Sequence, residues 1–353
     1  EIMSSDWSSD VCSSDLEEIP SPSCPAGFVK IRTTASLVSA GTEKLMTSLA
    51  KKSLVGKARS RPDLVRRTLQ KMQQEGVIST LQQVRSRLDT PVPLGYSCAG
   101  VVTEVGSGVD DLVVGDRVAC AGAGYANHAE ENVVPRNLCV PVPENVADGE
   151  AAFATVAAIA LQGVRQLDPT LGERIVVMGL GLVGQITCQL LAANGCRVIG
   201  SDFDANKREL ATRLGLERAV APDDLAQAAL EFTGGYGADG VIVAASTTSN
   251  QPLIDAAEIS RLKGRVVAVG LVGMDVPRDD YYRKELDLRL SMSYGPGRYD
   301  PSYEEGGADY PFAYVRWTEQ RNMEAFLDLV ALGRVDVRSL ITHRVDFQKA
   351  LSA

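Results

Sequence analysis

The chain has 353 residues, a formal net charge of -9 and an ordinary globular composition, with 45% hydrophobic and 23% charged residues. This length suits two well-buried domains better than one. The acidic charge argues against a surface that binds nucleic acid or an anionic membrane. The longest apolar runs, around residues 174–183 and 265–272, are much shorter than the ~20 residues of a membrane span. We therefore expect a cytoplasmic protein without nucleic-acid or membrane partners.

Seven cysteines occur at irregular spacings, and no two of them form a C-x-x-C pair. An odd number without such pairs indicates neither a disulfide framework nor a zinc knuckle. A reducing compartment fits this pattern.

Residues 1–16 are of low complexity, because Ser-Ser-Asp occurs three times in them with almost nothing apolar between. The run DVCSSDL at positions 10–16 looks like the translation of a sequencing-adapter oligonucleotide. We therefore exclude this tail from fold reasoning. At the other end, the chain stops inside a helical pattern, which we interpret as truncation of a longer parent protein.

Residues 17–143 show short alternating segments between glycines and prolines, a pattern typical of a small antiparallel β domain. Apolar residues at near-helical spacing interrupt this pattern and predict an inserted helical hairpin over residues 44–90. Lysine and arginine dominate the polar positions of the insertion. These basic residues form either a solvated helix face or a docking surface for another domain or an anionic substrate.

A helical stretch is predicted over about residues 149–167, and the sequence pattern changes after it. The four near-continuous apolar segments that follow, with helical segments between them, are RIVVMGL, RVIGSD, DGVIVAAS and GRVVAVGL. This alternation predicts an α/β domain with a doubly wound parallel sheet covered by helices on both faces.

A glycine-rich motif follows the first of these strands and precedes an amphipathic helix. Its residues are Gly179, Leu180, Gly181, Leu182, Val183 and Gly184. The glycines permit a tight turn and close approach of a pyrophosphate to the helix N-terminus. Asp202 ends the next strand, where its carboxylate can accept hydrogen bonds from the adenosine ribose and repel a 2′-phosphate. The motif predicts NAD as cofactor in preference to NADP, although nearby Lys207 can weaken that preference.

Several separated segments resemble the medium-chain dehydrogenase/reductase superfamily: SAGTE at 39–43, GYSCAGVVTEVG at 95–106, GDRV at 115–118, the glycine motif, and ITHR at 341–344. The resemblance implies a GroES-like catalytic domain (17–156), a Rossmann domain (157–317) with Gly270 at the cofactor, and a C-terminal segment (318–353) that returns to the catalytic domain. The active site is expected in the cleft between the two domains.

The insertion and the segment 294–317 are similar to a narrower group, the bacterial two-part oxidoreductases. In that group a glucose-fructose oxidoreductase-like domain follows the dehydrogenase. This similarity implies that the parent protein has a C-terminal oxidoreductase domain that is missing here. Assembly into a homo-oligomer is an open alternative.

Zinc-dependent members of the superfamily carry a cysteine where this chain has Ala40, a histidine where it has Tyr96, and a glutamate or cysteine near Thr155. The resemblance therefore implies that the zinc ligands are lost. Independently of it, the chain has only two histidines, and zinc sites are built mainly from histidine and cysteine. We expect no zinc.

Without a metal, another group must stabilise the oxyanion that develops at a carbonyl receiving hydride. The family framework implies Thr42 as the proton-relay hydroxyl, Tyr96 as a phenol in the cleft, and Glu43 in place of an aspartate. His128 is a further candidate acid or base. Each of these residues also has a structural interpretation, as a turn hydroxyl, a packing ring or a surface side chain.

The segment 294–317 concentrates aromatic residues and arginines in a chain that is only 5% aromatic. Rings that stack on a sugar and arginines that pair with a carboxylate suit a carbohydrate or sugar-acid substrate. The substrate candidates are Tyr294, Arg298, Tyr299, Arg316 and Trp317. The alternative is a packed or dimer-forming loop.

The leading hypothesis is thus a zinc-independent, NAD-dependent oxidoreductase acting on an alcohol or carbonyl of a small carbohydrate-like molecule. A second hypothesis is hydride transfer to an activated carbon-carbon double bond, as in zinc-independent quinone and enoyl reductases. A third is a non-catalytic NAD-binding module that serves a larger two-part protein.

Overall fold

The computed structural model describes residues 16–39, 41, 43 and 93–352. The chain divides into two units, one of residues 1–21, 38–95 and 345–353 and the other of residues 22–37 and 96–344. The second unit holds both β-sheets. The predicted helical insertion over residues 44–90 and the excluded tail, apart from Leu16, lie outside the described residues.

The first sheet is antiparallel and has five strands in the order β4-β1-β2-β3-β5. The strands are β1 (Phe28–Ser36), β2 (Ser97–Val105), β3 (Arg117–Ala121), β4 (Glu131–Pro135) and β5 (Cys139–Pro141), with a short 3-10 helix η1 (Arg136–Leu138) before β5. Alternate residues of β1, such as Val29 and Ile31, are fully buried, as expected for a sheet with one face on the core. The predicted antiparallel β domain is confirmed.

The second sheet is entirely parallel and has six strands in the order β11-β10-β9-β6-β7-β8. Its strands are β6 (Arg174–Met178), β7 (Arg197–Ser201), β8 (Arg218–Val220), β9 (Ala238–Val243), β10 (Ser260–Ala268) and β11 (Asp287–Leu290). If the six strands are renumbered 1 to 6 in chain order, their order across the sheet is 6-5-4-1-2-3, which is the doubly wound arrangement. The four predicted strands are confirmed. The sequence prediction omitted β8 and β11, which are only 3 and 4 residues long.

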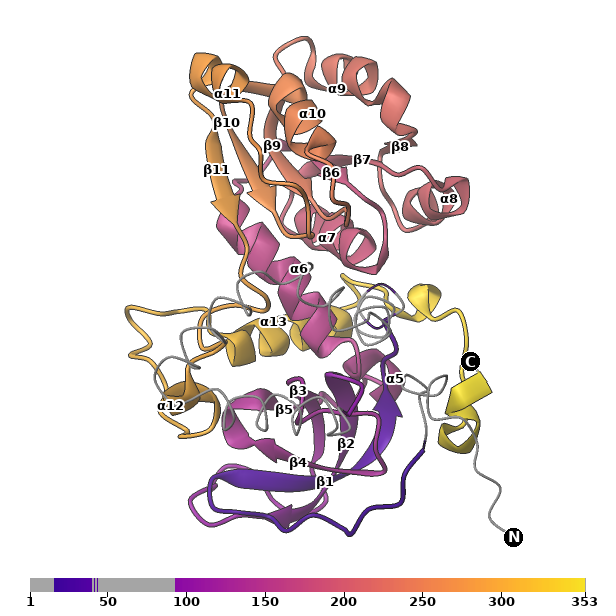
Figure 1. Ribbon diagram of the computed structural model, residues 1–353, viewed down its shortest axis with the longest axis vertical. Helices are drawn as coiled ribbons and strands as arrows, with labels where there is room; N and C mark the ends of the chain where they lie inside the picture. The colour runs from indigo at the N-terminus through magenta and orange to yellow at the C-terminus, as the bar shows by residue number, and fades with distance from the viewer. Residues whose placement is uncertain (1–15, 40, 42, 44–92, 353) are drawn as a thin grey trace, which may run out of the picture. The chain divides into compact units, whose positions relative to one another are not determined.

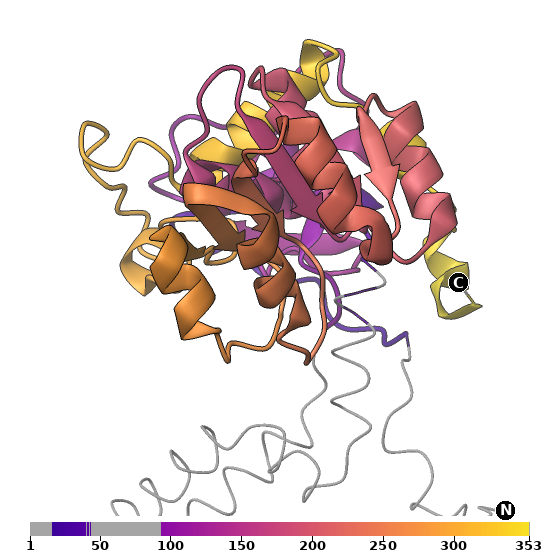
Figure 2. The ribbon, with the colours of Figure 1, turned by 90° about the horizontal axis from the view of Figure 1, so that it is seen from above.

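Helices cover both faces of the parallel sheet (Figure 2). Ile175 and Val177 of β6 belong to one hydrophobic cluster, while Val176 and Met178 belong to another on the opposite face. The helices are α7 (Leu182–Ala193), α8 (Ala205–Arg213), α9 (Leu225–Thr233), α10 (Gln251–Ile259) and α11 (Arg278–Lys284), with the 3-10 helix η2 (Pro222–Asp224) before α9. This alternation explains the near-continuous apolar strands, because both faces are buried.

Helix α6 (Ala154–Leu167) packs against strands of both sheets, and Figure 1 shows it running between them. A short helix α5 (Asp148–Ala151) precedes it, so the predicted helix over 149–167 is broken near Phe153. Gly163 allows α6 to approach β10, since a Cβ there would lie 2.5 Å from Cγ2 of Val269. The N-terminal part of α6 contacts the antiparallel domain through Thr155, and its C-terminal part contacts the parallel sheet through Gly163 and Leu167.

After β11 the chain forms α12 (Pro301–Glu304), α13 (Glu319–Ala331) and the 3-10 helices η3 (Arg338–Leu340) and η4 (Phe347–Ser352). Helix α13 packs on α6 and returns to the antiparallel sheet. The side-chain amide of Gln320 donates to the carbonyl oxygens of Arg136 and Cys139, and that of Asn145 donates to the carbonyl oxygen of Ala331. No helix among the described residues is long and apolar enough to cross a membrane.

Candidate functional site

The glycine motif lies where β6 passes into α7, at the carboxyl edge of the parallel sheet. Gly179 has a φ of +93°, which favours glycine, and a Cβ at Gly184 would lie 1.9 Å from the carbonyl oxygen of Gly179. A Cβ at Gly181, in contrast, would meet nothing within 4 Å. Two glycines thus serve close backbone packing, and Gly181 leaves open space at the N-terminus of α7, where backbone N–H groups attract an anion.

Asp202 follows the end of the neighbouring strand β7, and its side chain is 13% exposed. Its carboxylate accepts hydrogen bonds from the backbone N–H groups of Leu180 (2.8 Å) and Asp204 (2.9 Å). These contacts hold the carboxylate against the glycine loop, and an ionised carboxylate keeps lone pairs for further donors. The glycine loop and the Asp202 carboxylate are therefore adjacent, and their predicted contacts with a pyrophosphate and a ribose stay predictions.

The basic residues after Asp202 have different contacts. The Lys207 ammonium lies 3.8 Å from the Asp202 carboxylate. The Arg208 guanidinium donates to the carbonyl oxygens of Asp202 and Phe203, so it holds the loop backbone. The sequence pattern did not reveal this role of Arg208.

Gly270 follows β10, and a Cβ at this position would lie 1.9 Å from the carbonyl oxygen of Ala245. The requirement for glycine here comes from close packing between the segments after β9 and β10. A contact of Gly270 with the cofactor stays a prediction.

Two catalytic candidates, Tyr96 and His128, lie at one end of the antiparallel sheet. Ser36, the last residue of β1, pairs with Cys98 of β2, two residues after Tyr96. The Ser36 hydroxyl is hydrogen-bonded to Nδ1 of His128. Tyr96 and His128 therefore lie at the same end of the β1–β2 pair, and Ser36 is a neighbour of His128 that no sequence pattern indicated.

Thr155, at the start of α6, joins this end of the sheet. Its side chain is fully buried, and its hydroxyl donates to the carbonyl oxygens of Tyr96 (3.2 Å) and Cys120 (3.4 Å). Tyr96 itself is 8% exposed. The contact fixes the N-terminus of α6 to the backbone of Tyr96, directly before β2.

Of the remaining catalytic candidates, Glu43 accepts a hydrogen bond from the backbone N–H of Ser39 (3.2 Å). Thr42 and Ala40 lie outside the described residues. The structure therefore does not test the relay role predicted for Thr42.

The segment 294–317 is partly a packed loop. Tyr294 is only 4% exposed, and the Arg298 guanidinium lies 5.4 Å from its ring centroid. Arg298 forms an ion pair with Glu304 (2.6 Å), a partner that the sequence prediction omitted. Tyr299 is 67% exposed. The structure thus separates the predicted substrate residues: Tyr294 is buried and the charge of Arg298 is already compensated.

Arg316 and Trp317 form a different group. The Trp317 ring centroid lies 3.8 Å from the Arg316 guanidinium carbon and 3.2 Å from that of Arg165 on α6. Arg165 was not a sequence candidate, because nothing local distinguishes it from other helix-surface arginines.

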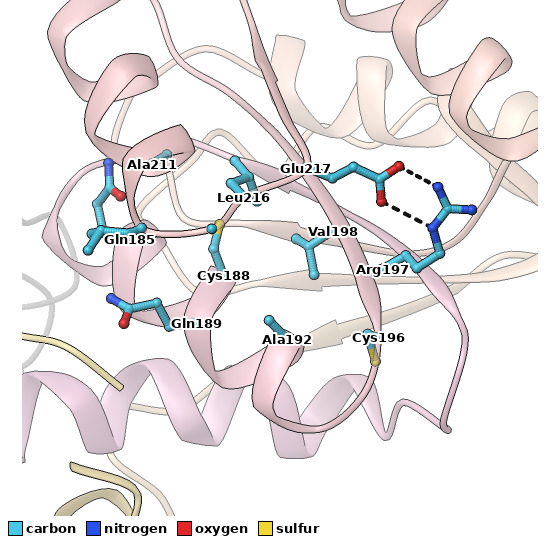
Figure 3. Close-up of a pocket in the computed structure, with 12 residues that line it drawn as sticks. Gln185, Cys188, Gln189, Ala192, Cys196, Arg197, Val198, Ala211, Leu216 and Glu217 are labelled. Atoms are coloured by element: carbon cyan, nitrogen blue, oxygen red, sulfur yellow. Dashed lines mark hydrogen bonds and ion pairs between the residues drawn. The ribbon is translucent and has the colours of Figure 1, made fainter. Parts of the chain in front are cut away.

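Figure 3 shows a pocket of about 150 Å³ on another part of the parallel domain, between α7 and the segment β7–α8. Arg197 and Glu217 form an ion pair at this pocket. Cys188 is buried beside it, and burial raises the pKa of its thiol to about 12, so the thiol is not a nucleophile at neutral pH. Gln185, also in the lining, donates to the carbonyl oxygens of Leu180 and Lys207. Gln185 thus links the lining of this pocket to the backbone of the glycine loop.

Two family models match the chain in sequence. An alcohol dehydrogenase GroES-like domain matches residues 68–160, and a zinc-binding dehydrogenase model matches residues 183–305. Among curated proteins, the probable D-xylulose reductase A of Aspergillus terreus is 28% identical over 300 residues, covering 74% of this chain and 77% of that protein. Sorbitol dehydrogenase of Arabidopsis thaliana is 26% identical over 295 residues, covering 73% and 74%.

Solved structures share the fold. Galactitol-1-phosphate dehydrogenase from Escherichia coli superposes with a TM-score of 0.69 at 17% identity, covering 96% of this chain and 91% of that one. A putative zinc-binding dehydrogenase from Sinorhizobium meliloti, bound to NADP, gives a TM-score of 0.70 at 20% identity, covering 97% and 92%. With its GroES-like domain, its doubly wound sheet and its glycine loop, this chain belongs to the medium-chain dehydrogenase/reductase superfamily and is an NAD(P)-dependent oxidoreductase.

Proposed function

We propose that the protein transfers hydride, without zinc, between NAD and the alcohol or carbonyl group of a polyol or sugar-like substrate. The observation that carries this proposal is the glycine loop with the anchored carboxylate of Asp202 beside it. The relatives named D-xylulose reductase and sorbitol dehydrogenase support a polyol or ketose as substrate. The resemblance to two-part bacterial oxidoreductases stays a prediction.

The residues present fit NAD. When bound, NAD supplies the hydride acceptor for alcohol oxidation, and its reduced form supplies the hydride donor. The backbone of residues 179–184 binds the pyrophosphate in the open space at Gly181. Asp202 accepts hydrogen bonds from the ribose hydroxyls, and its negative charge disfavours the 2′-phosphate of NADP.

The described residues at the family's zinc positions do not fit zinc. Tyr96 offers a phenol, and the Thr155 hydroxyl is already donated to two backbone carbonyls. Neither residue has the thiolate, imidazole or carboxylate that zinc requires. The nearby thiol of Cys120 is fully buried, and its hydrogen bonds with neighbouring cysteines together with burial hold its pKa well above the ordinary value.

Side chains of this protein must then bind the substrate oxygen. The Tyr96 phenol, directly before β2, donates a hydrogen bond to the substrate oxygen and stabilises the oxyanion that develops as hydride arrives. His128, bonded to Ser36 at the same end of the sheet, exchanges the proton with solvent. The Thr42 hydroxyl is the second group proposed here, as the hydroxyl that relays the proton.

A survey of xylitol, sorbitol and related polyols, followed by NADH absorbance, tests the activity. With the best substrate, Tyr96→Phe is expected to lower turnover by ~10²-fold to 10³-fold, the contribution of one strong oxyanion donor, with unchanged NAD affinity. Tyr236→Phe is the matched control, because Tyr236 is 84% exposed and lies between α9 and β9.

The mechanism is wrong if Tyr96→Phe and Thr42→Val both retain full activity. Elemental analysis separately tests the metal: about one zinc per purified chain rules out zinc independence. Turnover of an activated carbon-carbon double bond with no polyol oxidation at any pH rules out the substrate class.

A further inference from the structure

Trp317 lies between two guanidinium groups. The guanidinium carbons of Arg165 and Arg316 are 3.2 Å and 3.8 Å from its ring centroid. Two guanidinium groups cannot occupy the same face of one indole at these distances without overlapping. Arg165, from α6, and Arg316, from the segment before α13, therefore bracket the ring. Arg316 also lies 4.6 Å from the ring centroid of Phe312.

Neither arginine of this pair has a carboxylate in direct contact within the described part of the chain, and Glu324 interacts with Arg316 only at longer range. Arg165 donates through Nε to Oδ1 of Asn322 (2.9 Å), a neutral partner. No described carboxylate forms an ion pair with Arg165 or Arg316. Other arginines of the same region do have such partners: Arg298 with Glu304, Arg321 with Asp309 and Arg289 with Asp287.

Two positive groups on one ring repel each other. Burial and the charge of Arg316 lower the pKa of Arg165 to about 10, so both groups are still protonated at neutral pH. A guanidinium fork matches the two oxygens of a carboxylate or phosphate. An anion placed beside the ring edge can pair with both groups and relieve the repulsion.

We propose that Arg165, Trp317 and Arg316 form a binding site for the carboxylate or phosphate group of a small molecule. Arg316 is exposed, and Arg165 and Trp317 are half-buried, so a ligand can approach from solvent. The cofactor loop takes no part in this site. Arg165 follows Thr155 along α6 by nearly three turns, ~15 Å at the helical rise per residue. The site is thus a second one, separate from the groups proposed for hydride transfer.

Tryptophan fluorescence reports on this site directly. The chain has 2 tryptophans, Trp7 and Trp317, so Trp7→Phe leaves Trp317 as the sole emitter. The probes are inorganic phosphate and gluconate, with neutral sorbitol as a comparison. They are titrated into the full chain saturated with NAD, so that the pyrophosphate site is filled, at an ionic strength held constant with sodium chloride. Phosphate, gluconate or both should change the Trp317 emission in a saturable way, and sorbitol should not.

In the same background, Arg165→Gln and Arg316→Gln should each weaken the affinity by about tenfold or more, the effect of one charge-assisted hydrogen bond. Arg165→Lys keeps the charge but loses the fork, so it should recover only part of the affinity. Arg278→Gln is the matched control, because Arg278 also lies over a ring, that of Tyr282, but beside Asp279.

Saturation by phosphate alone identifies a phosphorylated ligand, and saturation by gluconate alone identifies a carboxylate; either result supports the site. The proposal fails if neither probe changes the emission, or if Arg316→Gln, at an exposed position that tolerates substitution, binds the probe as tightly as the parent. NAD affinity should be the same in all variants, so failure of the anion site leaves the proposed hydride transfer untouched.

Discussion

Glu319 begins α13 with a fully buried side chain, and both carboxylate oxygens lack a hydrogen-bond partner among the described residues. Burial, with a smaller effect from Glu304, raises its pKa from 4.5 to about 9, although Arg298 opposes the shift. The folded protein therefore binds one more proton than the unfolded chain between these two pH values. The contribution of this group to stability is complete below pH 4.5 and is lost as the pH rises toward 9.

Above pH 4.5 the free energy of unfolding falls by ~1.4 kcal/mol per pH unit because of this group, so at pH 7 it is lower by about 3 kcal/mol. Glutamine has nearly the same shape and does not ionise. Glu319→Gln should therefore leave stability at pH 5 almost unchanged and raise it by up to about 3 kcal/mol at pH 7, a shift of several degrees in the unfolding temperature.

Thermal unfolding at pH 5, 6, 7 and 8 measures the effect, with Glu209→Gln, an exposed position on α8, as the control. The difference between Glu319→Gln and the parent should widen with pH, whereas the control should show no trend. A difference that stays constant over this range refutes the buried, protonated carboxyl.

Three further outcomes are expected. NAD should bind more tightly than NADP, and Asp202→Ala should narrow the gap by ~1.5 to 3 kcal/mol; calorimetric titration showing equal affinities in the parent contradicts the role of Asp202. Gly184→Ala places a Cβ 1.9 Å from the carbonyl oxygen of Gly179, so both the unfolding temperature and NAD affinity should fall. Gly181→Ala meets no protein atom within 4 Å, so only NAD affinity should fall; an unchanged affinity shows that no pyrophosphate lies there.

The structure confirms the predictions that rest on contiguous patterns. The glycine motif, the strand before it and the helix after it are adjacent in sequence, so their chemistry is readable without tertiary information. Strands β6, β7 and β9 and the second half of β10 are rich in apolar residues on both faces and were recognised for that reason. Strands β8 and β11 are too short for a clear period, and they form because they pair with β7 and β10.

The segment 294–317 shows that amino-acid composition alone does not identify substrate-binding residues. Aromatic residues and arginines are concentrated there, yet the ring of Tyr303 stacks on that of Tyr310 at a centroid distance of 5.3 Å, and Tyr303 is fully buried. Composition cannot distinguish a ring that packs from a ring that binds, because both need the same residue type.

By itself, the sequence determined the parallel α/β domain, the antiparallel domain before it, and the order of glycines and acid that suits NAD. These features depend on local periodicity and on conformations that only certain residues adopt. The tertiary structure decided which distant groups meet. His128 reaches Ser36 across 92 positions, and Arg165 on α6 reaches Trp317 in the segment before α13. Such pairs have no sequence signature, because the pairing of β1 with β4 and the packing of α13 on α6 bring them together, and no local pattern encodes these long-range contacts.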